Sequence, residues 1–354
     1  MYQQYGKPSA PLLLQKKSFI EENVKHLNNQ RNIASIYIQQ PIRKNCKNCD
    51  QKLNEKNDFV KDRIGYKICP NCTHLNGANE DTNEFCEIAY SSDDGKNYAE
   101  NYVSENIESY NYRVATIYVP KAEFLATSLR GELEDPFRLE FLDFGAGSGY
   151  FVRALDSIGL KKVFGSEVSK AQVNLGNQMI GRELLRIHNL KNTAEVLSKT
   201  SANVVSMIGV LEHLQDPRGA IDAIRNNDKI KYFYISVPLF SLSVYVEMIS
   251  KNRFHRQLHG THTHLYTETS IAHLAEEFGF DIVSQWWFGT DMVDLYRNVY
   301  IDLEETEGSD SLRSHYQNMM KSIIDAMQLE IDKKHYSSEV HVLFKKRELS
   351  ESSK

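Results

Sequence analysis

The sequence predicts an α/β fold preceded by a small cysteine-rich domain. From residue 139 to residue 237, apolar runs that suit buried strands alternate with segments whose apolar residues recur at helical spacing. Ahead of these segments, two Cys-x-x-Cys pairs are separated by 19 residues. The chain has 354 residues, of which 41% are hydrophobic and 25% charged, and this composition suits one large globular domain and one small one.

The first strand-to-helix turn is rich in glycine. A buried strand is expected over Leu139–Phe144 and a helix from Phe151 onward, so the stretch Gly145–Gly149 lies between them. Glycine lets the backbone approach a ligand closely, and a helix N-terminus offers free N–H groups. The spacing is G-x-G-x-G, whereas the dinucleotide fingerprint would place its third glycine at Tyr150. The turn indicates a nucleotide-like cofactor, with tight packing as the alternative reason for the glycines.

Two further strands end in residues that suit such a cofactor. A short strand over Val163–Ser169 contains Glu167, which lies 18 residues past Gly149, and its carboxylate can accept hydrogen bonds from both hydroxyls of a ribose. A further apolar strand over Ala202–Val210 runs into Leu211–Pro217, where the sequence is Leu-Glu-His-Leu-Gln-Asp-Pro.

Together, these three segments resemble motifs of the class I methyltransferases, which use S-adenosylmethionine (SAM). The glycine-rich turn, preceded by Asp143, resembles their motif I, and Leu211–Pro217 is similar to the segment after the fourth strand of small-molecule methyltransferases. The resemblance covers roughly residues 137 to 345, with a last strand at 338–344. It implies a Rossmann-like methyltransferase fold, in which a mostly parallel seven-stranded sheet has helices on both faces and one antiparallel strand near the end.

The resemblance also implies which residues bind SAM. The residues that would surround its methionine portion are Asp143, Gly145, Gly147 and Gly149, while Glu167 would hold the ribose and Gly209 would offer backbone contacts to the amino group. The third strand, expected within 184–190, lacks the usual acidic residue before the adenine pocket. His188 and Asn189 are therefore only guesses for adenine contacts.

The two Cys-x-x-Cys pairs have the spacing of a zinc ribbon. The four expected ligands of one structural Zn²⁺ are Cys46, Cys49, Cys69 and Cys72, which would leave no open coordination position for water. Disulfides are the alternative, but the first 20 residues lack the long apolar core of a signal peptide, which favours zinc and a cytoplasmic location. Cys86 has no obvious partner, and we expect it to be a buried thiol.

Charge argues against a nucleic-acid partner. The chain has 42 basic and 47 acidic residues, a net charge of −5, and no sustained basic face follows the cysteines. We therefore expect the ribbon to pack on the catalytic domain or to shape its substrate entrance. The sequence has no apolar run of about 18 residues, so we expect no membrane-spanning helix. The oligomeric state stays open.

A histidine-rich segment is the main candidate for catalysis. Five of the 12 histidines fall between residues 255 and 273. Methyl transfer needs an aligned acceptor and often a base, and histidine titrates near neutral pH. The candidate catalytic residues are His262, His264 and the earlier His213, and Arg253 and Arg256 could hold a phosphate or carboxylate of the substrate. Alternatively, His264 only orients the helix expected over 269–278, or His259, His262 and His264 bind a metal.

Aromatic residues gather in two other places. A helical stretch ahead of the glycine-rich turn contains Tyr98, Tyr102, Tyr110, Tyr112 and Tyr118, and it either covers the cofactor pocket or is a packing helix. Within Trp286-Trp287-Phe288, strand geometry would place the first and third rings on one face and the second on the other.

The predicted organisation follows from these segments. Residues 1–40 form a polar arm with one helix near 17–27, residues 41–90 the ribbon, 91–130 a linker and helical cap, 131–348 the methyltransferase domain, and 349–354 a tail. The layout is similar to that of sugar methyltransferases of glycan or natural-product pathways. The predicted function is methyl transfer to a small, polar, phosphate-bearing acceptor such as a nucleotide sugar or glycan precursor. The alternatives are a nucleic-acid or protein methyltransferase that docks through the ribbon, and an inactive cofactor-binding scaffold.

Overall fold

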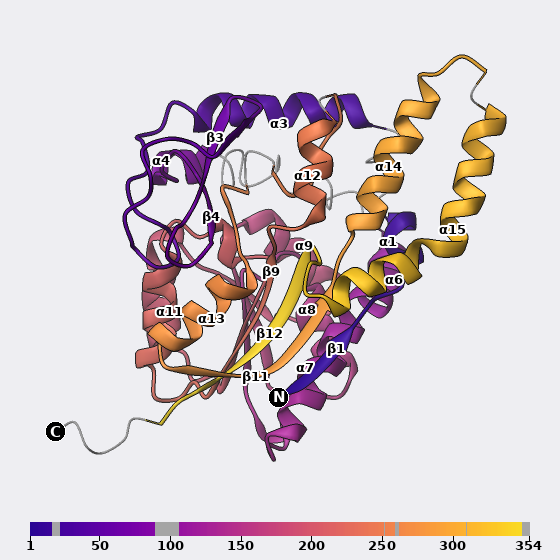
Figure 1. Ribbon diagram of the computed structural model, residues 1–354. Coiled ribbons are helices and arrows are strands. Elements are labelled where there is room, and N and C mark those ends of the chain that lie inside the picture. Colours follow the sequence, from indigo (N-terminus) through magenta and orange to yellow (C-terminus); the bar gives the residue numbers. More distant parts are fainter. Residues whose placement is uncertain (16–21, 89–105, 251, 259–261, 309, 349–354) are drawn as a thin grey trace.

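One eight-stranded sheet organises the molecule (Figure 1). The computed structural model describes residues 1–15, 22–88, 106–250, 252–258, 262–308 and 310–348. The strand order is β1-β11-β12-β9-β8-β5-β6-β7. The strands are β1 (Tyr2–Tyr5), β5 (Phe141–Phe144), β6 (Val163–Glu167), β7 (Leu185–Ile187), β8 (Val204–Ile208), β9 (Tyr232–Pro238), β11 (Phe280–Phe288) and β12 (Glu339–Lys346).

The sheet confirms the predicted topology and adds a strand. Neighbouring strands from β7 to β9 are parallel, and β12 lies antiparallel between β9 and β11. The eighth strand is β1, which runs parallel to β11 with Tyr2 opposite Ser284 and Tyr5 opposite Trp287. The predicted polar arm therefore begins with a strand at the edge of the catalytic sheet.

Helices cover both faces, as the alternation of strands and helices predicts. One face packs on α7 (Val119–Gly131), α8 (Tyr150–Ser157) and α9 (Lys170–Ile180), and the other on α10 (Thr193–Lys199), α11 (Pro217–Asn226) and α13 (Glu268–Glu277). Trp286 and Phe288 belong to the first core and Trp287 to the second, which confirms the expected alternation along β11.

The helical stretch ahead of β5 is continuous. It consists of α6 (Ile107–Arg113), a π-helical turn (Val114–Tyr118) and α7. Tyr98, Tyr102 and the predicted linker around 91–95 lie outside the described residues. Near the N-terminus, α1 (Ala10–Gln15) follows β1, and α3 covers Asn23–Tyr37, further along the chain than the helix expected near 17–27.

The ribbon is joined to the catalytic domain by a shared sheet. Its strands β2 (Phe59–Lys61), β3 (Ile64–Ile68) and β4 (Leu75–Gly77) are extended by β10 (His264–Leu265) of the catalytic domain, and α4 (Asn83–Cys86) follows them. The Gly77 N–H donates to the Thr263 carbonyl at 2.6 Å, and Asn48 Nδ2 donates to the Ser270 carbonyl at 3.0 Å. The ribbon thus packs on the catalytic domain. Cys86 is a buried thiol, as expected.

Three further helices lie around the edge strands. They are α12 (Leu242–Ile249), which packs on α14 and on the ribbon, and α14 (Asp291–Glu304) and α15 (Asp310–Lys333), which form a hairpin that extends beyond the sheet in Figure 1. None of the helices in the described ranges is both long and apolar enough to cross a bilayer.

Candidate functional site

A cavity of about 200 Å³ lies at the carboxyl ends of β5, β6 and β8. Its lining includes five of the six residues that the resemblance assigns to SAM, namely Asp143, Gly145, Gly147, Glu167 and Gly209. Gly149, the sixth, does not line the cavity. It begins α8 with a φ of 73°, and a Cβ there would lie 2.9 Å from Leu185 Cδ1.

The glycine-rich turn needs glycine for space as well as for backbone shape. Gly145 has a φ of +73°, and a Cβ on it would lie 2.5 Å from Val210 Cγ2. Gly147 has a φ of +54°, and its N–H donates to Glu167 Oε2 at 2.9 Å. The first parallel strands thus bring the turn and the acidic end of β6 into direct contact.

Backbone hydrogen bonds fix the Glu167 carboxylate at the cavity wall. Besides Gly147, the N–H groups of Val168 and Ser169 donate to its Oε1 at 2.8 and 2.9 Å. A carboxylate oxygen can accept more than one hydrogen bond, so the group retains capacity for a ligand hydroxyl.

Asp143 is a buried carboxyl at the base of the cavity. The Ser206 hydroxyl donates to its Oδ1 at 2.7 Å. Burial raises the pKa of Asp143 to about 7, and the nearby Glu167 acts in the same direction. A cation in the cavity would favour the ionised form and lower this pKa, which suits a ligand that carries positive charge.

Only one of the two guessed adenine contacts lines the cavity. His188 lies beside Phe144, with ring centroids 4.7 Å apart, and its Nδ1 is 2.8 Å from the Ser166 hydroxyl. Burial lowers the pKa of His188 to about 4, so the ring is neutral near pH 7. Asn189 instead accepts a hydrogen bond from the Lys191 N–H through Oδ1 and begins a 3₁₀ turn (Leu190–Asn192).

Two of the three candidate catalytic histidines come together. His213 lines the cavity at the end of a 3₁₀ turn (Leu211–His213), and the His262 ring lies beside it at a centroid distance of 5.0 Å. With Glu212 they form a cluster in which one polar atom of each residue lies within 4.8 Å of the other two, a spacing that could hold a metal ion. Burial raises the pKa of Glu212 to about 8, so this carboxyl is mostly neutral at pH 7.

His264 lies elsewhere. It is buried in β10, and its Nδ1 is 2.8 Å from His74 Nε2 in the ribbon. It does not line the cavity beside His213. Burial lowers the pKa of both rings well below the usual range. The structure therefore places His264 at the junction of ribbon and catalytic domain. His259 lies outside the described residues.

The two arginines of the histidine-rich segment also separate. Arg253 pairs with Asp302 and with Glu305, the latter at 3.0 Å between Nη2 and Oε2. Arg256 donates to the Thr290 hydroxyl and lines a second cavity. Of the two, only Arg256 faces a space that could receive a substrate group.

Tyrosines form the wall between the helical cap and the glycine-rich turn. Tyr150 stacks on Tyr110 and Tyr118, with ring centroids 4.8 and 5.2 Å apart. The Tyr110 hydroxyl donates to the Ser148 carbonyl at 3.0 Å. The sequence pattern predicts that Tyr110 and Tyr118 either cover the cofactor pocket or pack in a helix. It does not predict a role for Tyr150, whose only local signal is its place directly after the glycines.

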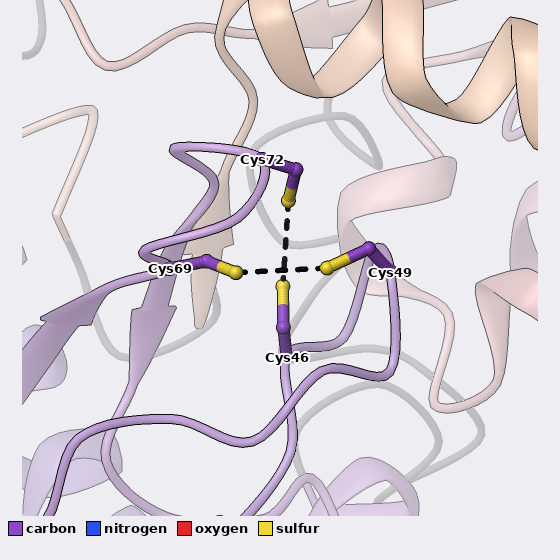
Figure 2. Close-up of side chains that lie close together, drawn as sticks. All are labelled: Cys46, Cys49, Cys69 and Cys72. Carbon is purple, nitrogen blue, oxygen red and sulfur yellow. Dashed lines mark hydrogen bonds between the residues drawn. The ribbon is translucent and has the colours of Figure 1, made fainter.

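The four cysteines converge on one point (Figure 2). Cys46 Sγ lies 3.7 Å from Cys72 Sγ, and Cys49 Sγ lies 3.5 Å from Cys69 Sγ. Tetrahedral zinc with bonds of about 2.3 Å would separate its sulfur ligands by about 3.8 Å. All four side chains are buried, and four thiolates this close together would repel one another. Four thiolates therefore need a cation at their centre, and the cluster fits a zinc ribbon.

Comparison with known proteins agrees with the fold and the motifs. Residues 110–285 match a family model described as a methyltransferase domain. Residues 110–285 therefore form a methyltransferase domain, and this match together with the glycine-rich turn and Glu167 at the cavity identifies a SAM-dependent methyltransferase. No curated protein matches the chain in sequence.

Solved structures give weaker similarities. The chain is similar to magnesium protoporphyrin IX methyltransferase from Synechocystis PCC 6803, with a TM-score of 0.45 and 13% identity over 73% of this chain and 97% of that chain. It is also similar to phosphoethanolamine N-methyltransferase 2 from Haemonchus contortus, with a TM-score of 0.43 and 15% identity over 75% of this chain and 60% of that chain. These similarities carry no information on the acceptor.

Proposed function

We propose that the protein transfers a methyl group from SAM to a small, polar, phosphate-bearing acceptor such as a nucleotide sugar or glycan precursor. The observation that carries this proposal is the neighbourhood of the two cavities. The first is lined by the glycine-rich turn and by His213, which belongs to the cluster with Glu212 and His262, and the second is lined by basic side chains and shares Tyr118 with the first. A methyl donor and an anionic acceptor could thus meet at Tyr118 and His213.

SAM would bind along the edge formed by β5, β6 and β8. The Asp143 carboxylate and the Gly209 carbonyl would accept hydrogen bonds from the amino group of the methionine portion, and Glu167 would accept them from the ribose. The Gly209 N–H already donates to the Ser236 carbonyl at 3.0 Å, so its free carbonyl is the group left for a ligand. Neutral His188, beside Phe144, would contact the adenine.

SAM, when bound, supplies an electrophilic methyl group. The acceptor atom must lie in line with it, and alignment by the protein provides much of the rate. His213 would remove the proton of the acceptor, because it lines the cavity and a neutral imidazole can accept a proton. Glu212 and His262 would orient its ring.

We also propose that Cys46, Cys49, Cys69 and Cys72 bind one structural Zn²⁺. Their Sγ–Sγ separations of 3.5 and 3.7 Å and their burial support a closed site that leaves no coordination position for water or substrate. Elemental analysis of the purified protein should find about one zinc per chain. A protein that is folded and free of metal would contradict this assignment.

Acceptor pairs that differ only in phosphate test the main proposal. S-adenosylhomocysteine (SAH) formation is measured with sugar nucleotides and with the matching free sugars, using the full chain and SAM. We expect turnover with at least one phosphorylated compound and a much higher KM for its unphosphorylated partner. SAM binding without turnover on any phosphorylated acceptor, while an RNA or protein substrate is methylated, would contradict it.

A further inference from the structure

We propose that the second cavity binds the phosphate group of the acceptor, and that Lys7, in the segment that follows β1, supplies one of its four cations. We call this space the basic cavity. The side chains that define it are Lys7, Arg113, Lys121 and Arg256, together with the single carboxylate Glu339. This inference rests on the proposed function, since it concerns the same acceptor, and it goes further by naming where the charged part of that acceptor binds.

The basic cavity is large enough for a phosphate. It lies next to the first cavity, at the carboxyl ends of β5, β6 and β8, which we call the cofactor cavity. Its volume is about 160 Å³, and a water needs roughly 10–15 Å³ by this measure, so there is room for a group of several atoms. Tyr118 lines both cavities. A molecule with its phosphate in one cavity could therefore present its other end to the first.

Two of the cations come from one helix face. Arg113, Ile117 and Lys121 are spaced four residues apart and all line the basic cavity. The π-helical turn between α6 and α7 lies within this stretch and ends at Tyr118. Turns of this kind are common at functional sites. The Arg113 guanidinium also lies over the Tyr150 ring, 4.7 Å from its centroid, which links the basic cavity to the wall of the cofactor cavity.

The third cation is held in place by the edge of the sheet. The Gly6 N–H donates to the Trp287 carbonyl at 3.0 Å, and Trp286 Nε1 donates to the Gly6 carbonyl at 2.9 Å. These bonds extend the pairing of β1 with β11 and bring Lys7 over the Phe288 ring, with Nζ 5.0 Å from the centroid. The fourth cation, Arg256, reaches the cavity from the segment after α12.

Negative charge in the basic cavity is scarce and already engaged. Glu339 Oε1 accepts hydrogen bonds from Lys121 Nζ at 3.3 Å, from the Ser236 hydroxyl at 2.8 Å and from His341 Nε2 at 3.1 Å. The Asp294 carboxylate lies 4.0 Å from Arg256 but does not line the cavity. Among the described residues that line it, cations outnumber carboxylates four to one.

The state of Lys7 reflects this imbalance. Burial lowers its pKa to about 7, and repulsion from Lys121 acts in the same direction. A dianion in the basic cavity would offset both effects. A phosphate suits the space better than a carboxylate, because it carries more charge and three oxygens that can accept hydrogen bonds from cations on different sides.

The basic cavity is also connected to the chemistry. Ser236, which donates to Glu339, accepts the hydrogen bond from the Gly209 N–H, and Gly209 and His213 both line the cofactor cavity. Glu339 and Lys121 are close enough to Glu212 to influence its pKa in opposite directions. The phosphate would therefore anchor the acceptor within reach of the cluster at His213.

Anion binding to the full chain tests this inference without knowledge of the acceptor. The protein is first saturated with SAH, and inorganic phosphate is then titrated by calorimetry into wild type, Lys7→Gln and Lys334→Gln. Lys334 is exposed on α15's C-terminal side and does not line the cavity, so its change is a matched loss of one charge. We expect phosphate to bind wild type and Lys334→Gln equally, and Lys7→Gln to bind it about tenfold more weakly.

A second variant guards against a purely structural effect. Arg256→Gln should weaken phosphate binding by a similar factor, and SAH affinity should stay within about twofold in every variant. If SAH binds but phosphate does not, or if Lys7→Gln and Arg256→Gln both bind phosphate as wild type does, the inference is overturned while the cofactor site stands. If SAH itself fails to bind, the proposed function fails first.

Discussion

The two cavities differ in how widely the residues that line them are spread along the sequence. The predicted cofactor residues of the first cavity come from successive strand ends between Asp143 and Gly209. The cations of the basic cavity come from positions 7, 113, 121 and 256. The first can be recognised from sequence because each wall segment carries its own local pattern. The second exists only once β1 has paired with β11 and the helical cap has packed, so it leaves no local pattern.

Removal of the metal should have the largest effect, and it should affect the ribbon much more than the cofactor cavity. The ribbon shares a sheet with β10, which begins two residues after His262. The cofactor cavity is instead built from the main sheet. Structural zinc can contribute on the order of 10 kcal/mol to a small domain. Chelation should therefore abolish methyl transfer and lower the melting temperature, while SAM still binds within several-fold of its original affinity. Equal loss of binding and turnover would show that the two parts are not separable.

The cluster beside the cofactor cavity should control rate more than affinity. His213→Ala should lower kcat by about 10²- to 10⁴-fold, the range for loss of a general base, with little change in SAM binding. His315→Ala, which removes an exposed histidine from α15, is the matched control and should leave kcat unchanged. Steady-state SAH release measures both. A kcat that stays within twofold in His213→Ala would assign the proton transfer to another group.

The buried Asp143 should make stability depend on pH. Its pKa is raised from an ordinary value near 3.8 to about 7, so between these values the unfolded chain loses a proton that the folded protein keeps. Stability from this group is present at low pH and falls as pH rises through the window, by about 4 kcal/mol in total. Chemical denaturation from pH 4 to 8 should show a steeper fall in stability in wild type than in Asp143→Asn, where Glu212 still contributes a slope of the same sign. Parallel curves would contradict the assignment.

The Glu167 carboxylate should contribute less, because backbone N–H groups already occupy part of it. Glu167→Ala should weaken SAM binding by roughly 1.5–3 kcal/mol, the value of hydrogen bonds to a charged group. Glu183→Ala, an exposed acid two residues before β7, should bind SAM as wild type does. Calorimetry on the two variants compares them directly. Equal affinities would remove Glu167 from the proposed ribose contact.

Sequence reasoning captured what depends on local pattern. The α/β class follows from periodicity and the four-cysteine cluster from spacing, while the mostly parallel sheet with one antiparallel strand follows from the resemblance to class I methyltransferases, and the structure has all three. The segment after α12 was harder to interpret. His262 and His264 are two residues apart, yet one meets His213 and the other meets His74 of the ribbon, because β10 pairs with β4. That pairing joins residues almost 190 apart, and no single segment encodes it.

The strand before Lys7 and the two arginines after α12 also depend on partners that are distant in the sequence. The stretch before Lys7 is short and polar, and its pattern predicts an arm rather than a strand. It becomes a strand because β11 offers an unpaired edge, with Trp286 Nε1 available as a further donor. Arg253 and Arg256 likewise look equivalent in sequence, and only the position of α14 commits Arg253 to Asp302 and Glu305.

Calorimetric measurement of SAM binding to wild type, Gly147→Arg and Gly181→Arg tests whether the glycine-rich turn forms the cofactor site. Both glycines have positive φ, +54° and +76°, so backbone strain is comparable. A Cβ on Gly147 would meet Gln172 Oε1 at 2.9 Å in the cavity wall, whereas one on Gly181 meets no atom within 4 Å. We expect wild type and Gly181→Arg to bind SAM alike and Gly147→Arg to bind it at least about 100-fold more weakly. No binding to wild type, or equal binding to all three proteins, would contradict it.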